Sequence, residues 1–166
     1  MLFDFAFIQV EVFYYDMRSE YTKDNYKLWT DLLAMGKRLW ATAGSDSHGD
    51  ATTAALTCIY SAEKKDLAYM DQLAVGDFTP GFAGIRMCIG DTVCGGQCAI
   101  ANKRLIVSIS DFHPSVHIKG HTYRVDILNA EGPVCSQELS YEDCKTPQYM
   151  AVDTVDSDFY RVELVD

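Results

Sequence analysis

The sequence predicts an α/β domain over residues 1–98, followed by a small all-β module, a sandwich, over residues 99–166. Three observations indicate this. Up to residue 76, stretches with strand periodicity alternate with stretches of helical spacing. From residue 104 on, short apolar runs are separated by turn residues, as in small β-sandwiches. The chain has 166 residues and is 48% hydrophobic, which is enough for a sizeable core.

The first elements predict a strand–helix–strand unit. Residues 5–15, FAFIQVEVFYY, are β-branched and aromatic and partly alternate, which is typical of a strand with one apolar face. Residues 24–35 carry apolar side chains three and four positions apart, and Gly36 can end this helix. Residues 37–43, KRLWATA, then predict a second short strand.

The remaining elements divide into two groups. The run 54–60 predicts a strand, and 63–75 predicts a helix that stops at Gly76. Beyond this glycine no helical spacing is found. The sequence NAEGP, 129–133, fits a hairpin turn. Strands are predicted at 104–110, 121–128, 134–140, 148–153 and 159–165.

The net charge and the cysteines indicate which partners and which cellular compartment to expect. A formal net charge of −10 repels phosphate backbones and anionic lipids, so we expect no nucleic-acid partner and no membrane partner. The opening residues lack the basic segment and cleavage site of a secretory signal. The six cysteines contain no CxxC pair and predict reduced, structural thiols in a cytoplasmic protein. A metal or redox pair of Cys94 with Cys98 is the alternative.

One loop carries candidate chemistry. The stretch ATAGSDSHGD, 41–50, places Asp46 and His48 one residue apart directly after a predicted strand. The loop after a strand is where α/β folds place their chemistry. A carboxylate and a neutral imidazole are ligands for Zn, Mn or Fe. The spacing alone favours a solvated turn over a metal site, and Asp50 is expected to be solvated.

The residues around this loop resemble a known family. Residues 29–49, WTDLLAMGKRLWATAGSDSHG, resemble the closing part of a PHP domain, the polymerase and histidinol phosphatase superfamily of metal-dependent hydrolases. The strand FIQVEVFYY resembles the family's penultimate strand, with a glutamate at Glu11. The IGD…GG segment from residue 89 and the ending FYRVEL resemble the C-terminal β-sandwich that some members add. The resemblance covers most of the chain.

The resemblance implies a fold and a function. The fold is the C-terminal portion of a PHP-type distorted β/α barrel followed by the sandwich. The function is that of a phosphoesterase with a multinuclear metal site, acting on a small-molecule phosphate ester. Asp46 and His48 are the family ligands that carry over, and no catalytic residue does. Glu11 would lie beside the site or face solvent.

The departures from the family limit this expectation. The family's early His-x-His is missing, because the four histidines lie at 48, 113, 117 and 121. We therefore expect a fragment of the enzyme that binds divalent metal weakly and hydrolyses little by itself.

The sequence supports two further expectations besides the enzyme fragment. The first is a non-catalytic binding or interaction module, in which the sandwich surface binds a partner or a glycan. The second is a homodimer or a higher oligomer that pairs strand edges left uncovered by half a barrel. His113, His117 and His121 are expected to scatter over the surface, and Trp29 and Trp40 are expected in the core.

Overall fold

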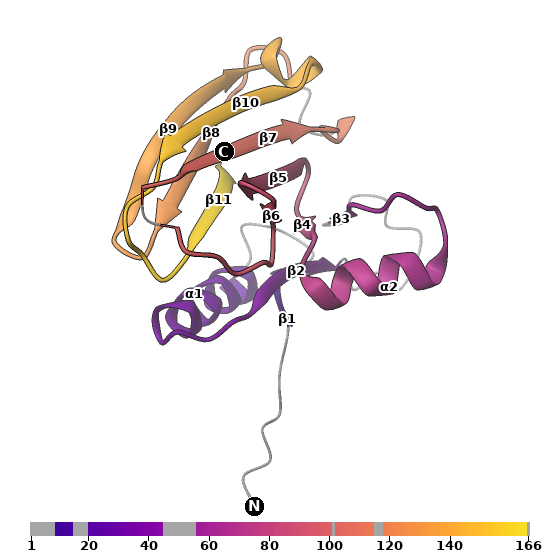
Figure 1. Ribbon diagram of the computed structural model, residues 1–166. Coiled ribbons are helices and arrows are strands. Elements are labelled where there is room, and N and C mark those ends of the chain that lie inside the picture. Colours follow the sequence, from indigo (N-terminus) through magenta and orange to yellow (C-terminus); the bar gives the residue numbers. More distant parts are fainter. Residues whose placement is uncertain (1–8, 15–19, 45–55, 101, 115–117, 166) are drawn as a thin grey trace, which may run out of the picture.

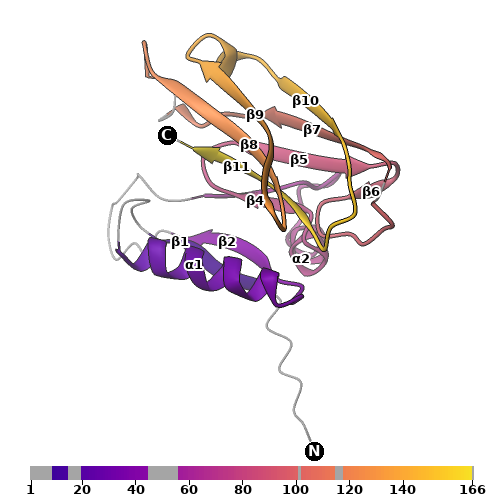
Figure 2. The same ribbon diagram turned by 90° about the vertical axis from the view of Figure 1, so that its left-hand side faces the viewer.

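The computed structural model describes residues 9–14, 20–44, 56–100, 102–114 and 118–165. Its fold mixes helices with strands and is rich in antiparallel sheet (Figures 1 and 2). The elements are β1 (Gln9–Tyr14), α1 (Glu20–Ala34), β2 (Trp40–Gly44), β3 (Thr57–Ile59), α2 (Asp66–Val75), β4 (Phe78–Pro80), β5 (Gly84–Ile89), β6 (Thr92–Val93), β7 (Arg104–Ser110), β8 (Thr122–Asn129), β9 (Gly132–Ser140), the 3₁₀ turn η2 (Asp143–Lys145), β10 (Gln148–Asp153) and β11 (Tyr160–Val165).

The predicted strand–helix–strand unit is confirmed. β1 and β2 pair in parallel, with Gln9 opposite Trp40 and Tyr14 opposite Gly44, and α1 packs along β1. The helix begins four residues before its predicted start. Glu20 then lies in the first turn, where a negative charge favours the helix dipole.

The second helix ends where the sequence predicts. Gly76 follows α2 with a φ of +84°, and its N–H donates to the carbonyl of Gln72. A Cβ at Gly76 would lie 2.2 Å from Nε1 of Trp40, so both the backbone angle and the neighbouring ring require glycine here. Next to α2, β3 pairs with β4 as an antiparallel ribbon.

The C-terminal part forms two antiparallel sheets. One has the order β10–β7–β5–β6 and the other β11–β8–β9. All five strands predicted in this region are present, and the predicted hairpin joins β8 to β9. The side-chain oxygen of Asn129 accepts from the N–H groups of Glu131 and Gly132, which holds the turn.

The four-stranded sheet extends across the expected boundary at residue 98. β5 pairs with β7 along its whole length, from Gly84 opposite Ser110 to Ile89 opposite Leu105. β5 and β6 therefore belong to the same sheet as the strands predicted for 99–166. The short runs around Gly90 concealed them, because a six-residue strand and a two-residue strand give little periodicity.

The hydrophobic core lies between these two sheets. Its fully buried side chains come from β7, β8 and β9: Leu105, Val107, Ile109, Val125, Ile127 and Leu139. By contrast, Thr22 is the buried residue of α1, and α2 buries none of its described side chains. Neither helix in the described part of the chain is long and apolar enough to cross a membrane.

Candidate functional site

The predicted metal ligands Asp46 and His48 lie outside the described residues, as does Asp50. What the structure places is the strand before them. β2 ends at Gly44, and its parallel partner β1 carries Glu11 opposite Thr42. The segment that carries Asp46 and His48 thus follows the carboxyl end of a strand in the sequence, as predicted.

The described residues do not supply a metal cluster by themselves. Among them, no group of three or more His, Cys, Asp or Glu side chains is arranged to hold a metal ion. The ring of His113 lies 6.0 Å from that of Phe82, and the ring of His121 lies 4.6 Å from that of Tyr123. His117 lies outside the described residues.

All six cysteines are free thiols in the structure. The thiol of Cys94 accepts a hydrogen bond from the N–H of Met87 at 3.2 Å. Burial raises the pKa of this thiol, so it is protonated at neutral pH and is a poor nucleophile. Cys94 and Cys98 are not joined by a disulfide.

A large cleft separates the strand–helix–strand unit from the two-sheet module. Its volume is about 1500 Å³, and its walls come from α1, the start of β2, the segment from β4 to β6, and β11. Both tryptophans of the chain, Trp29 and Trp40, line it and are only half-buried. The expectation that they belong to the core is therefore wrong, because the core formed between the two sheets instead.

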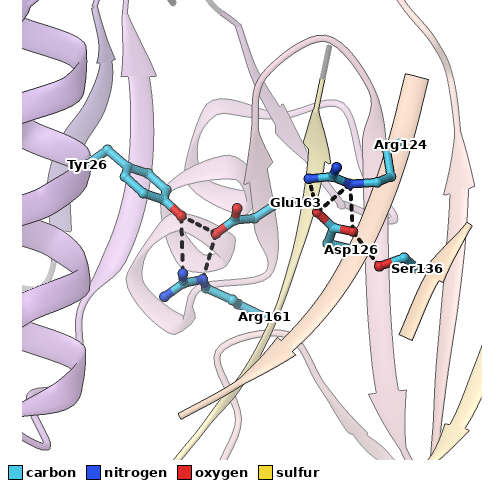
Figure 3. A network of polar contacts seen from close by, with 6 residues as sticks. All are labelled: Tyr26, Arg124, Asp126, Ser136, Arg161 and Glu163. Atoms are coloured by element: carbon cyan, nitrogen blue, oxygen red, sulfur yellow. Dashed lines mark hydrogen bonds and ion pairs between the residues drawn. The ribbon is translucent and has the colours of Figure 1, made fainter. Parts of the chain in front are cut away.

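A charged network joins the two walls of this cleft (Figure 3). The phenol of Tyr26 in α1 donates to Oε1 of Glu163 in β11 at 2.6 Å. Arg161 donates from Nε to the same oxygen at 2.7 Å and from Nη2 to the phenol oxygen at 3.1 Å. Three side chains thus satisfy one another across the cleft.

The pleat of β11 explains why its charges face the cleft. Tyr160, Val162 and Leu164 pack against the core, so the alternate residues Arg161 and Glu163 point the other way. Their side chains are still only 13% and 22% exposed, because α1 lies over them.

Aromatic rings surround the arginine. The guanidinium carbon of Arg161 lies 5.7, 5.5 and 5.7 Å from the ring centres of Tyr26, Trp29 and Phe159. At such distances the ring faces attract the cation. Burial, then the bond to Glu163, raises the pKa of Tyr26, so its phenol is neutral at physiological pH and can donate.

A second ion pair lies beside the network on the same sheet. Asp126 is opposite Glu163 in the register, is 5% exposed, and accepts two bonds from Nε of Arg124 and one from Ser136 (Figure 3). Burial works against the charged form of Asp126, but the bonds from Ser136 and Arg124 outweigh it and lower its pKa. Each of the two facing carboxylates therefore has its own arginine.

A third polar group lies away from the cleft wall. Nη2 of Arg86 is 3.3 Å from Oδ2 of the buried Asp77, and the guanidinium lies 5.1 Å above the ring of Tyr60. Burial raises the pKa of Tyr60 to about 12. These contacts hold β4 and β5 to the end of β3, and we assign them no chemistry.

The cleft residues were not predicted from the sequence. The alternation in FYRVEL does place Arg161 and Glu163 on one strand face. Their partner Tyr26 lies 135 and 137 positions away, however, and no local pattern pairs it with them.

Comparison of the chain with protein-family models, with curated proteins and with solved structures gives no match. The PHP resemblance therefore rests on the sequence motifs around residues 29–49. Any function has to be argued from the residues themselves and from where the fold places them.

Proposed function

We propose that this chain carries part of a PHP-type metal-dependent hydrolase, a phosphoesterase that acts on small-molecule phosphate esters. One observation carries the proposal. The segment SDSH directly follows Gly44, the last residue of β2, in a parallel strand–helix–strand unit. Such strand ends are where α/β folds gather ligand-binding and metal-binding side chains. Asp46 and His48 are two and four residues beyond this end.

The donor set suits a divalent metal but is short. A carboxylate and an imidazole together accept Zn, Mn or Fe. A bound ion of this kind lowers the pKa of a water molecule and stabilises phosphoryl oxygens. A catalytic zinc normally has three protein ligands, whereas Asp46 and His48 provide two. We propose that another polypeptide segment supplies the rest, and that this chain alone binds metal weakly.

We also propose a larger barrel around β1 and β2 and a homodimer of the chain. A sheet of two parallel strands is too small to be stable without further partners. On α2, Leu67, Met70 and Val75 are 80%, 61% and 53% exposed. We propose that β1 and β2 belong to a distorted β/α barrel, and that copies of the chain associate as a homodimer through these surfaces. A monomer mass by light scattering at high concentration would contradict the dimer.

Composition supports the proposed setting. Six free thiols suit the reducing cytoplasm, where we place the protein. The net charge of −10 argues against nucleic acid and anionic membranes as partners.

The test measures metal bound to the full chain purified without chelator. Elemental analysis and titration with Mn²⁺ and Zn²⁺ compare the wild type with Asp46→Ala, His48→Ala and Asp50→Ala. We expect weak binding that is lost in the first two variants and kept in the third, which is the matched control in the same loop. Equal metal uptake by all four proteins would refute the assignment of the ligands.

A non-catalytic binding module is the second candidate function. The cleft between α1 and β11 favours it, because a large cavity with aromatic walls and a few polar groups is typical of ligand sites. Ligand binding by a chain that takes up no metal through Asp46 would support this candidate over the first.

A further inference from the structure

The cleft lies at the start of β2, whereas the proposed metal ligands follow the end of this strand in the sequence. Its lining includes Trp40 and Ala41, the first two residues of β2, whereas the loop follows Gly44 at the other end of the strand. At about 3.3 Å per residue, three residues of strand place roughly 10 Å between Ala41 and the start of the loop. The inference about the cleft therefore rests on residues other than Asp46 and His48.

Most of the cleft wall is apolar. The cleft extends to the core between the two sheets, so side chains of the core form part of its lining. The apolar lining includes Leu33, Phe78, Ile85, Leu105, Val162 and Leu164. Its volume of about 1500 Å³ exceeds the roughly 300–1000 Å³ of most ligand sites. A compact apolar molecule would therefore fit in the cleft, and its binding would bury its own apolar surface together with that of the wall.

One cationic group in the wall has donor capacity left. Arg161 uses Nε for Glu163 and Nη2 for Tyr26. Its Nη1 has no hydrogen-bond partner among the described residues, and Figure 3 shows this nitrogen on the side away from Glu163. The side chain is 13% exposed, so an anion reaching Nη1 would meet little competition from water.

The charge balance of the lining also favours an anion. Four cationic side chains line the cleft, Lys23, Lys37, Arg38 and Arg161, against the three acids Asp156, Asp158 and Glu163. The whole chain has 14 Lys and Arg against 24 Asp and Glu. The lining of the cleft therefore lacks the excess of acids that the whole chain has. Because Glu163 already offsets one of these charges, a singly charged ligand fits better than a dianion.

We propose that the cleft binds a small apolar monocarboxylate, with its body against the tryptophans and the apolar lining beside them and its carboxylate at Nη1 of Arg161. Carboxylate oxygens match the guanidinium donors in geometry, and the charge strengthens the hydrogen bond.

The two tryptophans make a direct assay. Because Trp29 and Trp40 are the tryptophans of the chain and both line the cleft, intrinsic fluorescence reports its occupancy. The full chain is titrated with decanoate, with decanol as the uncharged analogue, and with inorganic phosphate. We expect a saturable change with decanoate, binding about tenfold weaker with decanol, and no response to phosphate. Decanol binding as tightly as decanoate would overturn the role of the anion, and no saturation with decanoate would overturn the site.

Variants then test the arginine. Arg161→Met should weaken decanoate binding about tenfold and leave decanol binding unchanged, whereas Arg161→Lys should retain part of the preference for decanoate. Arg104→Met is the matched control, because Arg104 is exposed on β7, pairs with Asp153 and does not line the cleft. Equal decanoate affinity in Arg161→Met and Arg104→Met, with circular dichroism showing both folded, would contradict the proposal. The comparison of decanoate with decanol needs no variant and decides the point if Arg161→Met does not fold.

Discussion

The phenol oxygen of Tyr26 lies 2.6 Å from Oε1 of Glu163, which ties α1 to β11 across 137 positions of sequence. Arg161 donates to both groups, so the contact is a closed set of three side chains. It is a direct polar link between the strand–helix–strand unit and the three-stranded sheet, and its strength can be measured.

Removing the phenol oxygen should weaken this link. Tyr26→Phe keeps the ring against Arg161 and removes the donor to Glu163, so we expect a loss of about 1–2 kcal/mol in the free energy of unfolding. Urea unfolding measures it. Tyr149→Phe is the control, because Tyr149 is 70% exposed on β10, and we expect almost no change there. Equal stability of the two variants would mean that the link contributes nothing.

The ion pair of Asp126 should make stability depend on acid pH. Its pKa is lowered in the folded protein, so its stabilisation is complete above the unfolded value of about 3.9 and is lost as the pH falls through the folded value. Asp126→Asn should therefore be less stable than the wild type at pH 7, by about 1–3 kcal/mol, and the difference should shrink below pH 4.

Asp153→Asn provides the matched comparison for this prediction. Asp153 also pairs with an arginine, Arg104, but its side chain is 81% exposed, and an exposed ion pair contributes little. Unfolding followed from pH 2 to pH 7 should show a small and nearly constant effect for Asp153→Asn. A gap between wild type and Asp126→Asn that does not change with pH would contradict the role of the charge.

Substitutions of two glycines distinguish the cost of an unfavourable backbone angle from the cost of a steric clash. Gly36 and Gly76 follow the two helices with φ of +73° and +84°. A Cβ at Gly36 meets nothing within 4 Å, whereas one at Gly76 meets the ring of Trp40. Gly36→Ala should cost about 1 kcal/mol for the backbone angle. Gly76→Ala should lower the free energy of unfolding by at least about 1 kcal/mol more than Gly36→Ala and should also shift the tryptophan fluorescence. Equal unfolding midpoints of the two variants would show that Trp40 moves aside freely.

The core between the two sheets should dominate stability. Leu139 is fully buried, so Leu139→Ala should cost about 2–5 kcal/mol through lost burial and the cavity left behind. Val155, which is 55% exposed in the segment after β10, is the control, and Val155→Ala should change stability by less than about 0.5 kcal/mol. Chemical denaturation of both variants tests the difference. An equal loss of stability in Leu139→Ala and Val155→Ala would contradict the dominance of this core.

Local periodicity accounts for the parts of the fold that were predicted. The strands at 104–110 and 148–153 were placed to the residue, because alternating apolar side chains on a half-buried sheet leave a clear period of two. The stop of α2 at Gly76 followed from the freedom of glycine at positive φ. The start of α1 was missed by four residues, because its first turn is polar and carries no apolar spacing.

By itself, the sequence determined the order and type of most elements, the acidic charge and the position of Asp46 and His48 after a strand, because each of these depends on neighbouring residues alone. Only the tertiary structure decided that β5 joins the sheet of β7, that the two tryptophans line a cleft instead of filling the core, and that Tyr26 meets Arg161 and Glu163. These contacts join positions far apart in the chain. They form where the pleat of β11 turns its charges toward α1, and local patterns do not specify such an encounter.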